Sequence, residues 1–98
     1  MEVNLDFLRK KISICDTKIL ELLNERFYWV ENVAKIKTAD KIPFRDYDRE
    51  KHIINNLIKH NKNLRPEFIE MLYILLFGEN EIYIRNKQID TTPPDEIA

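Results

Sequence analysis

Glycine, cysteine and proline are scarce in this sequence, and each scarcity narrows the choice of fold. The 98 residues contain one glycine, four prolines and one cysteine. A chain with so few turn-forming residues and 44% hydrophobic residues is predicted to be all-helical. Because Cys15 has no partner for a disulfide, we expect a reduced thiol, buried on a helix, in a protein of the cytoplasm.

Long apolar runs and an excess of either charge are also missing. No run of roughly 18 apolar residues and no signal-peptide pattern is present, so we expect neither membrane insertion nor export. Sixteen basic residues stand against seventeen acidic ones, a formal net charge of −1. No basic face stands out, and nucleic acid is therefore not expected as a partner. A chain of this length corresponds to one domain.

The first long stretch, from Leu5 to Thr38, is predicted to form one uninterrupted amphipathic helix. It contains neither proline nor glycine, and its apolar residues mostly recur at steps of three and four. Such a helix is about 50 Å long, which exceeds the width of a compact domain of this size. We therefore expect a partner chain to cover the apolar stripe. The stripe consists of Leu5, Leu8, Ile12, Cys15, Ile19, Leu22, Trp29, Val33 and Ile36.

One position of this stripe carries a charge. Arg26 stands between Leu22 and Trp29, where a guanidinium is costly unless it is paired or binds an anion. Lys37 follows about three turns later and within about 20° of the same face, so both cations line one groove. Arg9 is about 25 Å from Arg26 and turned by roughly 100°, so it joins the same pocket only if two copies run antiparallel. The alternative is that all three cations are simply solvated.

Two shorter helices are predicted to follow. After a polar loop, Asp46 is expected to cap a second helix that runs to about His60. Pro66 is expected at the first position of a third helix. Beyond it the apolar periodicity ends, so we predict a helical domain over residues 1–88 and a flexible tail over residues 89–98.

Motifs for common catalytic and metal sites are absent from the sequence. There is no zinc-ligand spacing, no phosphate-binding glycine loop and no Ser-His-Asp or Cys-His arrangement, so we expect neither a metal nor another cofactor. What remains is a set of cations and acids that the helices can bring together. Arginine forks in such a set suit a small dianion with two carboxylates. The set consists of Arg9, Arg26, Lys37, Asp46, Arg49 and Glu50.

Several blocks of the chain occur in the order and spacing of a known family. They are Leu8 to Ile12, Asp16, Leu22 to Arg26, Ala34 to Lys37, and Pro43 to Glu50. Together they resemble the all-helical, type II chorismate mutases, and the similarity extends over roughly residues 5 to 85. The resemblance implies an intertwined helical homodimer with two equivalent sites, each completed by the first helix of the other subunit. The same superfamily includes isochorismate-pyruvate lyases and 4-amino-4-deoxychorismate mutases.

The resemblance also implies how the cations act in converting chorismate to prephenate, a step of aromatic amino acid biosynthesis. Arg26 and the partner chain's Arg9 hold the two carboxylates, while Lys37 contacts a carboxylate and the ether oxygen. The reaction is an intramolecular rearrangement in which a C–O bond breaks as a C–C bond forms. It needs neither nucleophile nor metal. The enzyme folds the flexible arm over the ring and stabilises the charge that grows on the ether oxygen.

Four further residues receive roles from the same resemblance. Arg49 supports the carboxylate end of the substrate, and Asp46 and Glu50 receive the ring hydroxyl. Asn80 stands where the family has a small polar residue near a substrate carboxylate.

The third helix departs from the family pattern at one position. The family has Gln or Glu one turn after Asn80, as a second hydrogen-bond donor to the ether oxygen, whereas this chain has Ile84. Loss of one such donor costs about 10²–10³ in rate. Glu81 or Gln88 would have to replace it, and otherwise the chain is a weak mutase or acts on a different substrate.

Three other functions stay open on the sequence alone. A non-enzymatic helical dimerisation module has no use for the block from Pro43 to Glu50. An isochorismate-pyruvate lyase is disfavoured because the acidic pair in that block is typical of mutases. A 4-amino-4-deoxychorismate mutase is favoured if Glu81 adds a carboxylate near a ring ammonium.

Overall fold

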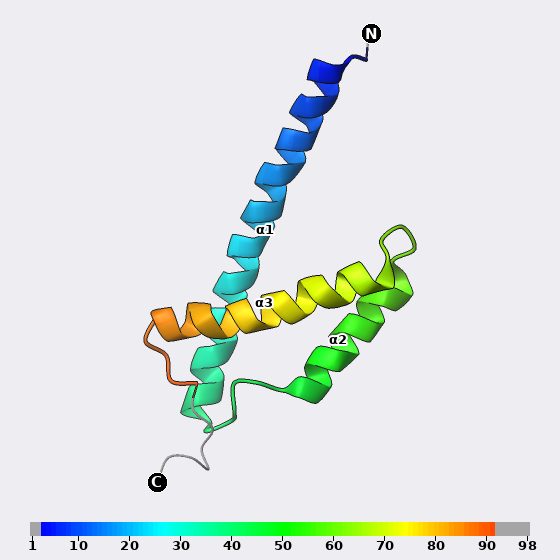
Figure 1. Cartoon of the computed structure of the whole chain (residues 1–98). Coiled ribbons are helices and arrows are strands. Elements are labelled where there is room, and N and C mark those ends of the chain that lie inside the picture. Colours follow the sequence, from blue (N-terminus) through cyan, green and yellow to red (C-terminus); the bar gives the residue numbers. More distant parts are fainter. Residues whose placement is uncertain (1–2, 92–98) are drawn as a thin grey trace.

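The computed structural model describes residues 3–91, and this part of the chain consists of three α-helices with no strand (Figure 1). Helix α1 spans Leu5–Ala39, α2 spans Tyr47–His60 and α3 spans Pro66–Asn86. The predicted all-helical chain with a very long first helix is therefore confirmed, although α1 ends one residue later than expected. Among the described residues, no helix is both long and apolar enough to cross a membrane.

The helix ends follow from local sequence. The side chain of Asn4 accepts a hydrogen bond from the amide of Phe7 at 2.9 Å, which caps α1. Asp46 accepts one from the amide of Arg49 at 3.0 Å and so caps α2, as predicted. Pro66 opens α3, where its missing N–H costs no helical hydrogen bond.

The turn after α1 directs the chain back toward the helix it has just left. The amide of Ile42 donates to the carbonyl of Lys37 at 2.8 Å, and the amide of Lys41 donates to that of Thr38 at 3.2 Å. This pair of bonds is a Schellman motif, and Lys41 adopts the left-handed φ of 58° that the motif requires. The following loop, residues 43–46, is thereby brought beside the C-terminal part of α1.

Helix α3 lies between the other two and contacts both (Figure 1). It crosses α1, and the rings of Phe27 and Tyr83 stack at this crossing with centroids 4.9 Å apart. The buried core is small and lies where α3 packs against α1 and α2. It consists of Ala34, Ile54, Ile69, Leu76, Phe77 and Ile84.

The N-terminal half of α1 extends away from the other two helices and contacts neither of them (Figure 1). Its apolar stripe is uncovered in a single chain, since Leu5 is 59%, Ile12 59% and Leu22 64% exposed. Cys15 lies on the same half and is exposed as well. The prediction of a buried thiol is thus wrong for one chain, because none of the described residues 3–91 covers this part of α1.

The first residues after α3 fold back onto the helices. The hydroxyl of Thr38 donates to the carbonyl of Asp90 at 3.3 Å, and Arg85 donates to the hydroxyl of Thr91 at 3.1 Å. These contacts involve the beginning of the predicted tail. Its remainder, residues 92–98, lies outside the described part of the chain.

Candidate active site

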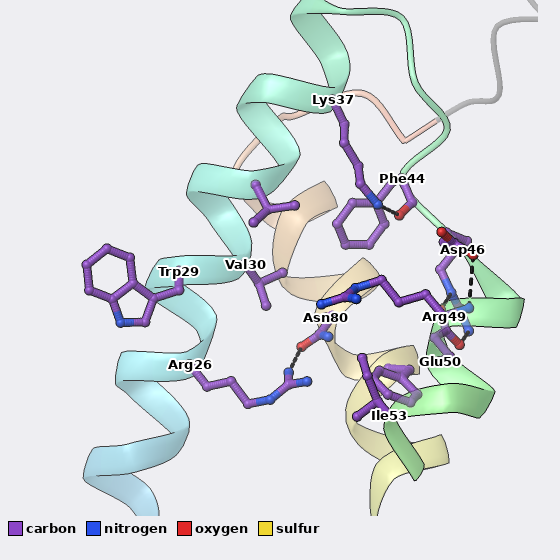
Figure 2. A pocket seen from close by; sticks show the side chains of 13 residues that line it. Arg26, Trp29, Val30, Lys37, Phe44, Asp46, Arg49, Glu50, Ile53 and Asn80 are labelled. Atoms are coloured by element: carbon purple, nitrogen blue, oxygen red, sulfur yellow. Dashed lines mark hydrogen bonds and ion pairs between the residues drawn. The ribbon is translucent and has the colours of Figure 1, made fainter. Parts of the chain in front are cut away.

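A pocket of about 280 Å³ lies where the C-terminal half of α1 meets the loop 43–46, α2 and α3 (Figure 2). Four of its side chains are cationic and two are acidic, which leaves an excess of two positive charges. Such an excess suits a ligand with two carboxylates. The lining comprises Arg26, Trp29, Val30, Val33, Lys37, Phe44, Arg45, Asp46, Arg49, Glu50, Ile53, Phe77 and Asn80.

Arg26 reaches the pocket because its side chain extends from α1 toward α3. Its guanidinium donates to the side-chain oxygen of Asn80 at 3.1 Å and lies 5.7 Å from the ring centroid of Tyr73 and 5.8 Å from that of Phe77. The amide and the two aromatic faces offset the cost of a cation on the apolar stripe. The break in the stripe therefore marks the place where α1 contributes to a polar pocket.

The contact with Arg26 fixes the orientation of the Asn80 amide, which is 7% exposed. A guanidinium has only donors, so the amide must turn its oxygen toward Arg26. The amide nitrogen then faces the space between α1 and α2 (Figure 2). Asn80 thus presents N–H donors to the pocket.

Lys37 is held by the loop that follows its own helix. Its ammonium donates to the carbonyl of Phe44 at 2.9 Å and lies 5.9 Å from the centroid of the Phe44 ring. An ammonium has three donors, so two stay available to a ligand after this bond is made. The Schellman turn that returns the loop to α1 therefore also positions the Lys37 ammonium.

The acidic side of the pocket is organised by Arg45. Its guanidinium forms a fork with Glu50, with both N···O distances 2.8 Å, and a third bond of 3.1 Å to Glu81. The other oxygen of Glu81 accepts from Arg85 at 2.6 Å. The hydrogen bond to Glu50 raises the pKa of Arg45 further above its ordinary value.

The structure brings most of the predicted site residues together. Apart from Arg9 and Ile84, every one of them lines the pocket: Arg26, Lys37, Asp46, Arg49, Glu50 and Asn80. Arg49 extends from α2 into the same space as Arg26 and Asn80 (Figure 2).

Two predicted residues lie elsewhere. Arg9 is on the uncovered half of α1, beside Asp6 and far from the pocket within one chain. Ile84 is completely buried at 0% exposure and is not among the lining residues. Glu81 and Gln88, the two residues considered as replacements for the missing donor, do not line the pocket either. Glu81 is hydrogen-bonded to Arg45 and Arg85, and Gln88 follows the end of α3.

Sequence reasoning missed Arg45 as a site residue. It lies in the block from Pro43 to Glu50, but nothing local indicates that it pairs with Glu81, which is 36 positions away. The only sequence signal was its place five positions before Glu50. The apolar wall contributed by Ile53 was also not predicted as part of a site, whereas Val30 and Val33 lie on α1 between Arg26 and Lys37, along the predicted groove.

Comparison with known proteins agrees with this geometry. Residues 8–81 match the family described as chorismate mutase type II. The chain belongs to the type II chorismate mutase family. This result confirms the resemblance noted in the sequence blocks, and the three-helix fold with its long first helix is the one that the resemblance implied.

Relatives within the family have two architectures. The chain is 34% identical over 84 residues to the chorismate mutase of Methanocaldococcus jannaschii, an alignment covering 64% of this chain and 85% of the relative. It is 40% identical to a bifunctional chorismate mutase/prephenate dehydratase of Enterobacter agglomerans and 37% identical to that of Escherichia coli K12, each over 75 residues. These two alignments cover 74% of this chain and 19% of the relative, so the chain spans about a fifth of the bifunctional proteins.

Proposed function

We propose that this chain is a chorismate mutase that rearranges chorismate to prephenate in aromatic amino acid biosynthesis. Family membership supports the reaction class. The observation that carries the proposal is the convergence of Arg26, Lys37 and Arg49 from two helices on one small pocket. A rearrangement of a dicarboxylate needs a cationic, shaped pocket and no nucleophile.

Each cation has a part in this mechanism. Arg26 and Arg49 bind substrate carboxylates, for which a planar fork of donors is well suited. Lys37 places its free N–H donors on the ether oxygen, where negative charge grows as the C–O bond breaks. Because the Phe44 carbonyl already holds the ammonium, little reorganisation is needed during the reaction.

Uncharged residues of the pocket contribute shape and one more donor. Val30, Val33 and Ile53 form apolar walls that favour the folded form of the enolpyruvyl arm over extended forms. The Asn80 amide is oriented by Arg26 and offers an N–H donor to the part of the substrate that lies next to Arg26. Since Ile84 supplies no donor, Lys37 and Asn80 share the stabilisation of the transition state, and turnover is expected to be low.

The proposal includes a homodimer. The uncovered stripe on the N-terminal half of α1 requires a second surface, and another copy of α1 running antiparallel supplies one. In this arrangement Arg9 of the partner subunit completes the pocket, so each site draws residues from two chains. A cytoplasmic location is also part of the proposal and rests on the single cysteine, which has no disulfide partner in the sequence.

The decisive experiment compares three substrates. The purified chain is incubated with chorismate, isochorismate or 4-amino-4-deoxychorismate, with and without a chelator, and the products are identified by chromatography. We expect prephenate from chorismate at a rate that the chelator does not change. Consumption of isochorismate to pyruvate and salicylate, or of chorismate no faster than in buffer, would refute the proposal. A Lys37→Ala sample prepared in parallel excludes a contaminating mutase.

A further inference from the structure

The acidic residues of the pocket are already paired before any ligand binds. Both oxygens of Glu50 accept hydrogen bonds from Arg45 at 2.8 Å. Arg45 is in turn bonded to Glu81, and the side chains of all three residues are only 17–24% exposed. Ion pairs with this degree of burial and fork geometry are more persistent than pairs on an open surface.

Pairing changes what Glu50 can offer a substrate. An ionised carboxylate has about four acceptor positions, so Glu50 can still accept a hydrogen bond from a neutral hydroxyl. Its charge, however, is balanced by the guanidinium of Arg45 in direct contact. A cationic group placed next to Glu50 would therefore gain little attraction and would approach Arg45 as a like charge.

Asp46 does not compensate for this loss of negative charge. One of its carboxylate oxygens accepts from the Arg49 amide at 3.0 Å and caps α2. Arg45 precedes it directly in the chain, and the Arg49 side chain lines the same pocket. At the end of the pocket that holds the acids, the charges of Arg45 and Arg49 therefore balance those of Asp46 and Glu50, and no excess of negative charge remains for a cationic group.

We propose that Arg45, anchored by Glu81, is a specificity-determining residue: it neutralises Glu50 and thereby selects a ring hydroxyl over a ring ammonium. The inference rests on the proposed function, since it concerns the substrate of that pocket. It assigns a role to Glu81 that is different from a direct contact. Glu81 lies outside the pocket and acts by holding Arg45 in place, while Arg85 occupies its second oxygen.

The test measures a ratio rather than an activity. Chorismate and 4-amino-4-deoxychorismate differ in having a hydroxyl or an amino group on the ring, so the ratio of their affinities reports the charge near Glu50. The single tryptophan, Trp29, turns its ring away from the other labelled residues of the pocket (Figure 2), so dissociation constants are measured by titration calorimetry, in which the heat of binding is separated from the slower heat of turnover. We expect the unmodified protein to bind chorismate at least tenfold more tightly than the amino compound.

Arg45→Gln should move this ratio at least tenfold toward the amino compound, because the charge of Glu50 is then uncompensated. Arg45→Lys keeps a positive charge but loses the fork, and its ratio should fall between the two. The matched control is Arg85→Gln, which removes a cation from the same chain of ion pairs outside the pocket and should leave the ratio unchanged.

Two results would overturn the inference. One is an unmodified protein that binds both compounds equally, a measurement that needs no variant to fold. The other is a folded Arg45→Gln or Arg45→Lys protein whose ratio equals that of the unmodified protein. Absence of chorismate turnover would refute the proposed function instead and would leave the binding ratio interpretable.

Discussion

Replacing Ile84 with glutamine sets a gain in catalysis against a loss of stability. The side chain of Ile84 is fully buried, at 0% exposure. Burial of an isoleucine contributes about 1.5–3 kcal/mol, and glutamine keeps part of this through its methylene groups. A buried amide without partners costs about 1–3 kcal/mol. We therefore expect Ile84→Gln to lower the free energy of unfolding by about 2–4 kcal/mol, out of the roughly 5–15 kcal/mol that is typical of a folded protein.

The expected gain lies in kcat on chorismate. If the new amide donates to the ether oxygen, it restores an interaction that is worth about 10²–10³ in rate, although burial and imperfect geometry will reduce the gain. KM should change less, because an interaction formed mainly in the transition state appears in kcat. Initial rates of chorismate loss give kcat, and thermal unfolding followed by circular dichroism at a fixed protein concentration gives the stability change.

The control for this prediction is Ile84→Met, which has nearly the length of glutamine but no donor. It should lose little stability and gain no activity. A folded Ile84→Gln protein whose kcat is no higher than that of Ile84→Met would refute the reasoning. Position 84 would then be too far from the reacting atoms, and Lys37 with Asn80 would be the complete set of donors.

Two further predictions concern the cations and the proposed dimer. Arg26→Ala and Lys37→Ala should each lower kcat/KM more than tenfold, above about 1.4 kcal/mol, with an unchanged circular dichroism spectrum. The control is Lys35→Ala, which removes a 61% exposed side chain and should change the activation free energy derived from kcat/KM by less than about 0.5 kcal/mol. Equal losses of kcat/KM in all three variants would contradict the assignment of Arg26 and Lys37 to the active site. Ile12→Glu should prevent association in sedimentation experiments, whereas Lys10→Glu, about 160° around the helix from Ile12, should not. A stable Ile12→Glu dimer would place the interface elsewhere.

The parts of the fold that the sequence predicted well are those governed by neighbouring residues. Asp46 caps α2 by accepting the amide of Arg49, three positions later, and Pro66 opens α3 through its own ring. The length of α1 follows from an unbroken helical period without glycine or proline. These features depend on interactions within one helical turn, which can be read directly from residue order.

Contacts between helices were less accessible from the sequence. Arg26 meets Asn80 across 54 positions, and this pairing depends on the angle at which α3 crosses α1. Glu81 follows Asn80 directly, but one residue turns a helix by about 100°, so its side chain meets Arg45 instead of the pocket. Residue order alone does not fix the rotation of α3 about its axis, and so it could not separate the side chains that face the ligand from those that support the loop.

The uncovered half of α1 has a consequence for mixtures of variants. If Arg9 serves the pocket of the other subunit, Arg9→Ala and Arg26→Ala proteins should each be inactive alone yet complement one another after subunit exchange. In a mixed pair, one pocket combines an intact Arg26 with an intact Arg9 of the partner subunit, while the other pocket lacks both. Random reassociation of equal amounts should therefore restore about a quarter of the original activity. A chain that carries both substitutions would show no such recovery when it is mixed with either single variant or with itself. Whether a pocket is active would therefore depend on which two chains form the dimer.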